Sequence, residues 1–147
     1  MANIFDVAKY ILEKQGETGI WKLQKLCYYA QAWTLAWTDK PLFAEDFEAW
    51  HNGAVSPELY YKYKGKYYID KEMIDNGNTD NLSDDEKDSI NVVLNEYGDW
   101  QPYELRERVC NDEPWIIARN KMQLNENSNP IITKESMLLY YSDLLVE

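Results

Sequence analysis

The sequence is poor in histidine and cysteine, the residues from which zinc sites and thiol-based catalytic centres are built. Its 147 residues include one histidine, His51, and two cysteines, Cys27 and Cys110, which lie far apart and follow no Cys-x-x-Cys spacing. Neither a zinc site nor a disulfide framework is therefore expected, and we expect no metal ion and no cofactor. Two unpaired thiols are typical of a reducing compartment, so the sequence predicts a cytoplasmic protein.

Long apolar runs are also lacking. A membrane-spanning helix needs about 18 or more consecutive apolar residues, and no such stretch occurs. Residues 1–6 contain no basic segment followed by an apolar one, so they do not resemble a secretion signal. A membrane partner is not expected, which again favours the cytoplasm.

Positive charge is in short supply. The chain has 15 Lys and Arg against 26 Asp and Glu, which gives a formal net charge of −11 and a pI of about 4.5. This average field would repel phosphate backbones, so direct nucleic-acid binding is not expected. The same field would speed the encounter with a basic partner. Enzymes that attack RNA are commonly basic because they grip phosphates, and an acidic inhibitor would suit them.

Aromatic residues, by contrast, are abundant. The chain has 6 Trp, 12 Tyr and 3 Phe, which is more aromatic bulk than one hydrophobic core of this size usually requires. We therefore expect some of these rings to line a surface. The length fits one domain over residues 1–147, and a domain of this size buries roughly two thirds of the surface of its unfolded chain.

Helical periodicity and capping signals predict a mostly helical protein. Two pairs of residues, Asn3 with Asp6 and Ser83 with Glu86, have the spacing of capping boxes at helix N-termini. Proline at the first turn and threonine at an N-cap mark further helix starts. Helices are expected at about residues 4–16, 20–37 and 83–97, and from residues 102, 114 and 133 onward.

The segment at 20–37 is apolar nearly all round, which is typical of a central buried helix. Trp33 and Trp37 are expected on its inner face, so both should lie in the core. The last helix should bury one side. The residues expected on that side are Met137, Leu138, Tyr141, Leu144 and Leu145.

The helical period fails between residues 39 and 68, where proline and glycine divide the chain into short pieces. Short strands are expected at about 47–51 and 66–70, and these would pair as a small ribbon against the helices. A polar loop is expected at 76–80. The predicted fold class is α+β, mostly helical, with a central buried helix surrounded by other helices and a short β-ribbon.

Two catalytic arrangements are conceivable. The first is a nucleophilic pair of Cys110 with His51, since such pairs are joined by the fold rather than by the sequence. Cys110 shows no activating motif, however, and the neighbouring Asp112 and Glu113 would raise the pKa of the thiol. The second is the acidic cluster at 45–48, whose carboxylates could act as acid and base or could face a basic partner.

Tyrosines alternate with lysines over residues 60–68. The residues are Tyr60, Tyr61, Tyr63, Tyr67 and Tyr68, with Lys62, Lys64 and Lys66 between them. Such a pattern resembles a stacking platform for single-stranded nucleic acid, but three lysines stand here against a strongly acidic background. Tyrosine and tryptophan are also enriched at the hot spots of protein interfaces. Ordinary core packing is the third interpretation.

Several short motifs occur in an order that is similar to a known family. They are Phe5-Asp6-Val7-Ala8, Leu23-Gln24-Lys25-Leu26, Phe47-Glu48-Ala49-Trp50, Gly53-Ala54-Val55, Pro57-Glu58-Leu59-Tyr60 and Pro114-Trp115. Together they resemble the Panacea domain of SocA-like antitoxins, which is often found in phage and prophage genes. The resemblance implies an antitoxin, not an enzyme, that binds and neutralises a cognate protein toxin. Some family members act as proteolytic adaptors, so a cellular protease is a second implied partner.

The chain departs from the family pattern at two places. The family usually shows Lys-His-Gly-Pro-Val where this chain has His51-Asn52-Gly53-Ala54-Val55, and Val109-Cys110 stands in place of a Thr-His pair ahead of Pro-Trp. Any chemistry that used those histidines would be lost here, which favours a binding role over an enzyme or a nucleic-acid adaptor. The residues expected to contact the partner are Trp50, His51, Asn52, Tyr60 and Tyr61.

Overall fold

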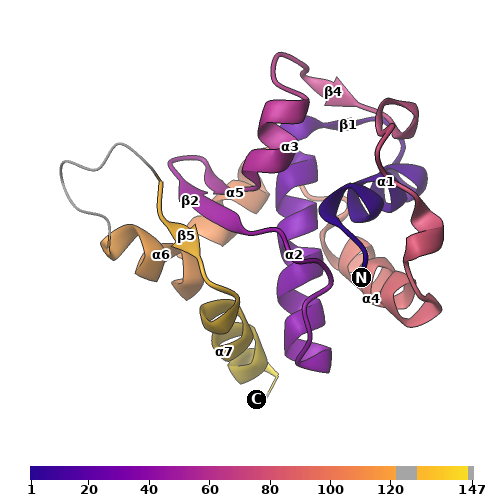
Figure 1. Cartoon of the computed structure of the whole chain (residues 1–147). Coiled ribbons are helices and arrows are strands. Elements are labelled where there is room, and N and C mark those ends of the chain that lie inside the picture. The colour runs from indigo at the N-terminus through magenta and orange to yellow at the C-terminus, as the bar shows by residue number, and fades with distance from the viewer. Residues whose placement is uncertain (122–128, 146–147) are drawn as a thin grey trace.

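A computed structural model of the chain describes residues 1–121 and 129–145 (Figure 1). The helices are α1 (Ile4–Gln15), α2 (Ile20–Thr38), α3 (Pro57–Lys62), α4 (Asp84–Tyr97), α5 (Pro102–Asn111), α6 (Glu113–Asn120) and α7 (Lys134–Leu144), with short 3-10 helices η1 (Lys71–Met73) and η2 (Thr79–Asn81). The strands are β1 (Thr18–Gly19), β2 (Phe47–Trp50), β3 (Gly53–Val55), β4 (Tyr68–Ile69) and β5 (Ile131–Ile132). The predicted α+β, mostly helical fold class is confirmed.

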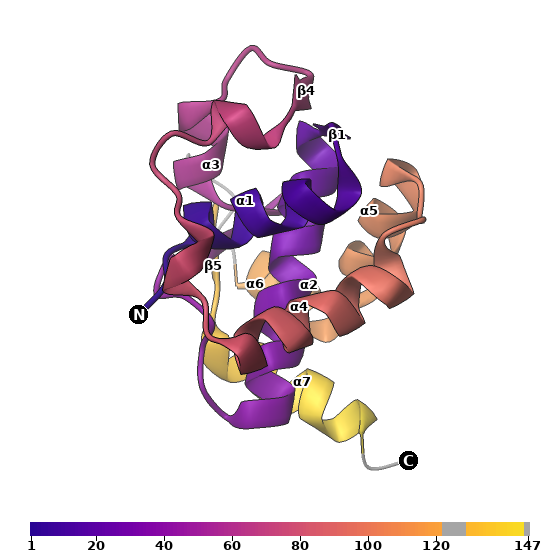
Figure 2. The same ribbon diagram turned by 90° about the vertical axis from the view of Figure 1, so that its right-hand side faces the viewer.

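Helix α2 forms the centre of the structure. It packs against α7, α4, α1 and α5, and two views at right angles show it running between them (Figures 1 and 2). Leu23, Leu26 and Ala30 are fully buried, so the prediction of a central buried helix is confirmed. The prediction for its two tryptophans is wrong: Trp33 is half-buried and Trp37 is 39% exposed. Both line a groove that α4 and α7 leave open along the end of α2.

Both predicted capping boxes are present. Asn3 Oδ1 accepts a hydrogen bond from Asp6 N at 2.9 Å, and Asp6 Oδ2 accepts one from Asn3 N at 2.8 Å. Ser83 and Glu86 form the same reciprocal pair at the start of α4. Asp6 has a second role, because its Oδ1 also accepts a hydrogen bond from Asn78 N at 2.7 Å. The polar loop predicted at 76–80 is thereby tied to α1, and η2 begins within it.

The β-structure differs from the predicted ribbon. Strands near 47–51 and 66–70 are present, but they do not pair with each other. Strand β2 lies between β3 and β5, with Ala49 opposite Ala54 and Phe47 opposite Ile132, whereas β4 pairs with β1. The strand pairing was predicted wrongly for two reasons. Residues 53–55, which follow β2 after a two-residue turn, were expected to be a turn and not a strand, and β5 lies far along the chain.

Two glutamines of α2 hold the backbone of neighbouring loops. Gln24 Oε1 accepts a hydrogen bond from Ser56 N at 2.7 Å, and its Nε2 donates one to Ser56 O at 3.0 Å. Gln31 Oε1 accepts from Leu42 N at 2.7 Å, and its Nε2 donates to Phe43 O at 2.7 Å. All five residues are buried, so these bonds satisfy backbone groups that water cannot reach. Gln24 thereby fixes the start of α3.

A buried carboxylate joins α7 to the rest of the structure. Asp112, between α5 and α6, accepts hydrogen bonds from the hydroxyl groups of Tyr29 on α2 at 2.9 Å and of Tyr141 and Tyr140 on α7 at 2.6 and 3.2 Å. Arg108 Nε lies 3.4 Å from the Asp112 carboxylate. Helices α2, α5, α6 and α7 therefore share one polar contact point inside an otherwise apolar core.

The buried side of α7 is narrower than predicted. Met137 and Tyr141 are buried as expected, and Leu138 and Leu144 are partly buried. Leu145 is 49% exposed, so its predicted burial is wrong. The reason is that Leu145 follows the last helical residue and lies at the rim of the groove beside Trp37.

Candidate functional site

The turn between β2 and β3, His51–Asn52, is exposed and stands on a fixed backbone. Arg119 Nη1 on α6 donates a hydrogen bond to Ala49 O at 3.1 Å, and Trp115 Nε1 donates one to Trp50 O at 2.9 Å. These bonds hold the two residues that lead into the turn. The turn side chains therefore project from a hairpin whose backbone is anchored to α6.

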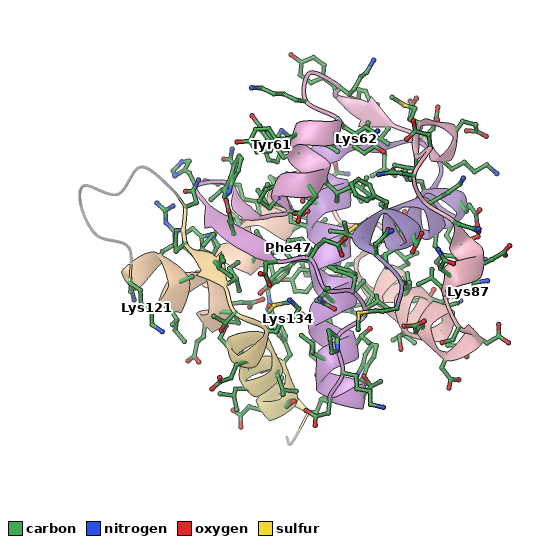
Figure 3. The ribbon with its side chains drawn as sticks, viewed as in Figure 1. Phe47, Tyr61, Lys62, Lys87, Lys121 and Lys134 are labelled. Atoms are coloured by element: carbon green, nitrogen blue, oxygen red, sulfur yellow. The ribbon has the colours of Figure 1, made fainter. Side chains whose placement is uncertain are left out.

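Aromatic rings cluster beside the turn. The Trp50 ring centre lies 4.8 Å from that of Tyr60, which in turn lies 5.1 Å from Tyr61 and 6.1 Å from Trp21. Trp50 and Tyr60 are half-buried, whereas Tyr61 is 67% exposed. Tyr61 projects outward from α3, while Phe47 on β2 points toward α2 (Figure 3). The structure thus brings the five residues predicted to contact a partner into one group, in which Trp50 and Tyr60 support the more exposed side chains.

A shallow acidic hollow of about 610 Å³ adjoins Tyr61. Besides Tyr61, the hollow is lined by Ala44, Glu45, Asp46, Glu48, Pro57, Glu58 and Ile131. Carboxylates gathered around one concave surface attract the ammonium or guanidinium group of another molecule. The hollow therefore extends the aromatic group with a surface of negative charge.

Each carboxylate of the predicted acidic cluster has a structural partner. Glu45 Oε1 accepts a hydrogen bond from the first amide of α1 at 3.2 Å, and Asp46 Oδ1 pairs with Lys134 Nζ at 2.7 Å. Glu48 Oε1 accepts a hydrogen bond from Trp50 Nε1 at 2.8 Å. These three carboxylates thus hold three different elements instead of converging on one reacting atom, an arrangement that does not suit paired acid and base catalysis.

Cys110 and His51 do not form the pair that the catalytic alternative requires. The thiol is half-buried on α5, the imidazole is exposed in the turn, and no hydrogen bond joins these two residues. Burial raises the pKa of the Cys110 thiol, and three nearby cations oppose this shift. The predicted direction is right, but its predicted cause is wrong, since Asp112 faces the tyrosines of α2 and α7. A neutral thiol without a base is a weak nucleophile.

A buried lysine lies beneath the turn, and sequence reasoning assigned it no role. Lys25 on α2 is 2% exposed, and its Nζ lies 5.0 Å from the centre of the Trp21 ring. Gly53 has a φ of 115°, and a Cβ at this position would lie 3.1 Å from Lys25 Cε. Glycine suits both that φ and that close approach. Burial lowers the pKa of Lys25 to about 8, with Cys110 opposing the shift and Arg106 adding to it.

Arg106 on α5 is a second cation in this region, and its charge adds to the effect of burial in lowering the pKa of Lys25. Its Nε is buried and has no hydrogen-bond partner within residues 1–121 and 129–145. Arg106 precedes Cys110 by one helical turn. A lysine inside a helix that is apolar all round was a signal that could have identified Lys25. Arg106 carries no such signal, because the other residues of α5 alternate in the ordinary amphipathic way.

The tyrosines and lysines of residues 60–68 do not form one platform. Tyr63 is buried and packs against the Phe5 ring at 6.5 Å between centres. Lys62 pairs with Asp75 at 3.4 Å. The side chains of residues 60–68 are therefore shared between the core and the surface. Tyr63 is buried, whereas Tyr61, Tyr67 and Tyr68 are exposed.

Neither a metal-ligand cluster nor a membrane-spanning helix is found in the parts of the chain that the structure describes. There, no three side chains of His, Cys, Asp or Glu gather as ligands for a metal ion. The same residues include no helix with the length and apolar character that crossing a bilayer requires.

A protein-family model matches the central part of the chain. The family is described as antitoxin SocA-like, Panacea domain, and its model matches residues 23–116. This segment runs from α2 into α6 and contains the turn, Lys25, Arg106 and the rings of Trp50, Tyr60 and Tyr61. Comparisons with curated proteins and with solved structures give no match. Because the match covers more than half of the chain, the protein belongs to the SocA-like antitoxin family that is defined by the Panacea domain.

Proposed function

We propose that the protein is an antitoxin that neutralises a cognate protein toxin by direct contact, without catalysis of its own. Membership in an antitoxin family supports this role. The structural observation that supports the contact is Tyr61, a ring 67% exposed on a short helix beside a hollow lined by carboxylates. Exposed aromatic rings on a fixed support are typical anchors of protein interfaces.

The proposed recognition face consists of Trp50, His51, Asn52, Tyr60 and Tyr61. Its backbone is held before binding, by α6 at the hairpin and by Gln24 at the start of α3. Little conformational entropy is then lost when a partner docks. The acidic hollow is proposed to take lysine or arginine side chains of a basic toxin, in keeping with the net charge of −11.

Neutralisation has two possible outcomes for the toxin. The antitoxin either covers the active surface of the toxin or delivers the bound toxin to a cellular protease. Both routes begin with the same binding step, and they differ in the lifetime of the toxin in cells. A toxin that persists during co-expression indicates coverage, and one that disappears faster indicates delivery.

The product of the reading frame beside this gene is the candidate toxin for a test. Co-expression should relieve its inhibition of growth, and calorimetry should detect a complex. Tyr61→Ala and Asn52→Ala should each weaken the complex by about 1–2 kcal/mol or more, the range of interface anchors, with an unchanged melting temperature. Tyr103→Ala is the matched control, because Tyr103 is 65% exposed on α5. Wild-type affinity in both test variants would show that the interface lies on another face of the protein.

A further inference from the structure

The groove at the C-terminal end of α2 is lined mainly by apolar side chains. Trp33 and Trp37 line it with their ring centres 5.9 Å apart, together with Val92 of α4 and Leu145 at the end of α7. Trp37 is 39% exposed, Leu145 49% and Val92 52%. Single exposed apolar side chains are ordinary on a protein surface, but a group of them around one groove is typical of an interaction site. The volume of about 250 Å³ is below the range of about 300–1,000 Å³ for small-molecule sites, so the groove suits side chains of a protein.

The groove lies away from the recognition face. Trp21, whose ring packs against Tyr60 of that face, is near the N-terminal end of α2, and Trp37 is near its C-terminal end. At a rise of 1.5 Å per residue, these two tryptophans are separated by about 24 Å along the helix. In Figure 1, α3 lies beside the upper end of α2 and α7 lies beside the lower end. A molecule bound in the groove therefore leaves the recognition face free.

The lining of the groove offers almost no partners to an extended peptide backbone. Trp33 Nε1 already donates a hydrogen bond to the Tyr97 hydroxyl group at 3.1 Å. The lining residues that the structure describes lie in helices or directly after one, so they present no strand edge. A helix satisfies its own backbone groups, whereas an extended peptide would leave those that face the groove unpaired. A helix also places side chains one turn apart at about 5–6 Å, which is close to the separation of the Trp33 and Trp37 rings.

The charges around the groove are negative. Glu96 is the one charged side chain among the described residues that line it. Asp88 and Asp143 are exposed on α4 and α7, within about one helical turn of lining residues. Arg108, whose charge acts on the α4 side of the groove, is paired with Asp112 at 3.4 Å. These carboxylates attract lysine and arginine, whereas a second copy of the chain, with its own net charge of −11, would be repelled.

We propose that this groove binds a basic amphipathic helix of a partner protein. Apolar side chains one turn apart on that helix pack against Trp33 and Trp37, and a lysine or arginine side chain beside them pairs with Glu96. Docking of an amphipathic helix into an apolar groove is a common mode of protein recognition. The site goes beyond the proposed function and does not depend on it, because the recognition face lies at the other end of α2.

A synthetic peptide provides the probe. It has about 18 residues, or five helical turns, with leucine at spacings of three and four residues and lysine at the other positions. The peptide should shift the indole signals of Trp33 and Trp37 in ¹⁵N NMR spectra along a saturating curve. A peptide of the same composition, with its leucines spread around the helix, should bind at least about tenfold more weakly. Groove signals that do not saturate, or that respond equally to both peptides, overturn the site.

Variants at exposed positions test whether the groove itself is occupied. Val92→Ser removes an apolar side chain from the lining and should weaken peptide binding at least about fivefold, with an unchanged melting temperature because Val92 is 52% exposed. Leu139→Ser is the matched control, since Leu139 is 64% exposed on α7 and does not line the groove. Trp37→Ala should weaken binding at least about tenfold. Wild-type affinity in both Val92→Ser and Trp37→Ala overturns the groove as the site.

The basic character of the helix is tested separately. Glu96→Gln should weaken binding about threefold at low salt, because it removes the carboxylate in the groove. Glu107→Gln, at an exposed glutamate of α5, makes the same change in net charge and should bind the peptide like the wild type. Equal weakening in the two variants, or equal binding of a peptide with glutamate in place of lysine, overturns the basic partner. Self-association of the protein in sedimentation experiments that Val92→Ser abolishes would overturn it too, because a second copy would then occupy the groove.

Discussion

At the scale of single residues, the polar side chains of α2 fall into two kinds. Gln24 and Gln31 are buried with every side-chain bond directed at a loop backbone, so they stabilise the fold. Lys25, between them in sequence, is equally buried but has no such partner. A side chain that lowers stability and lies beside an exposed turn is typical of a functional position.

Replacing Lys25 by methionine should stabilise the protein by about 2 kcal/mol at pH 7, because the variant no longer buries an unpaired charge. The pKa of Lys25 falls from 10.5 to about 8 on folding. Between these values the unfolded chain binds more protons, so this residue makes the wild type more stable as the pH rises. The advantage of the variant should therefore shrink toward pH 9.5. Urea unfolding of both proteins at pH 7 and at pH 9.5 measures this difference in the free energy of unfolding. A difference that does not change with pH would contradict the lowered pKa of Lys25.

Local sequence signals predicted the capping roles of single residues well. They predicted the burial of single side chains less well. The capping roles of Asn3 and Ser83 depend on neighbours three residues away, so the sequence contains all the information. The burial of Trp37 depends instead on how far α4 and α7 extend along α2, which no local pattern records. The exposed turn at 51–52 was predicted from its residue types, but Lys25 beneath it was not, because helix and hairpin meet only in the fold.

At the scale of elements, α7 is held by the tyrosine contacts of Asp112. Asp112→Ala should lower the free energy of unfolding by about 3 kcal/mol, because it leaves the buried hydroxyl groups of Tyr29 and Tyr141 without their acceptor. Hydrogen exchange should show the amides of α7 losing protection first. Tyr140→Phe is the control, since its hydroxyl group is only partly buried, and it should cost about 1 kcal/mol. Equal losses in the two variants would show that the carboxylate does not organise this contact.

The elements themselves were largely predictable, and their pairing was not. Helices with caps and an amphipathic period were expected at nearly the observed bounds. Strand β5 has two residues and lies more than 80 positions from β2, so its pairing depends on where α6 and α7 direct the chain. Strand β4 pairs with β1 for the same reason, because α1 and α2 place residues 18–19 beside it.

At the scale of the whole molecule, the net charge of −11 should govern the rate of association. If the acidic hollow and the average field attract a basic toxin, the association rate should fall clearly as salt is raised from about 0.05 to 0.5 M, while the dissociation rate changes less. Stopped-flow measurements with the candidate toxin give both rates. An association rate that is independent of salt would assign the negative charge to solubility alone.

The matched family segment, residues 23–116, is smaller than the unit that the core contacts require. Helix α7 lies outside it but covers Tyr28 and Tyr29 on α2 through Tyr141. We predict that residues 1–147 form one domain, and that a chain ending at residue 121 does not fold cooperatively. Calorimetry should give a single transition for the full chain and none for the shortened one. A cooperative transition in the shortened chain would make α7 an accessory element.

In the anchored hairpin, the groups that hold the fold are separate from the side chains that we propose to contact a partner. Arg119 and Trp115 bind main-chain carbonyl groups, which every amino acid possesses, so the hairpin keeps its shape whatever side chains occupy the turn. Mutation at positions 51, 52 and 61 can therefore explore new partners with little loss of stability. Across relatives that face different toxins, sequence variation should concentrate at these three positions and be least at Gly53, whose φ of 115° disfavours every other residue and where a Cβ would press on Lys25 Cε at 3.1 Å.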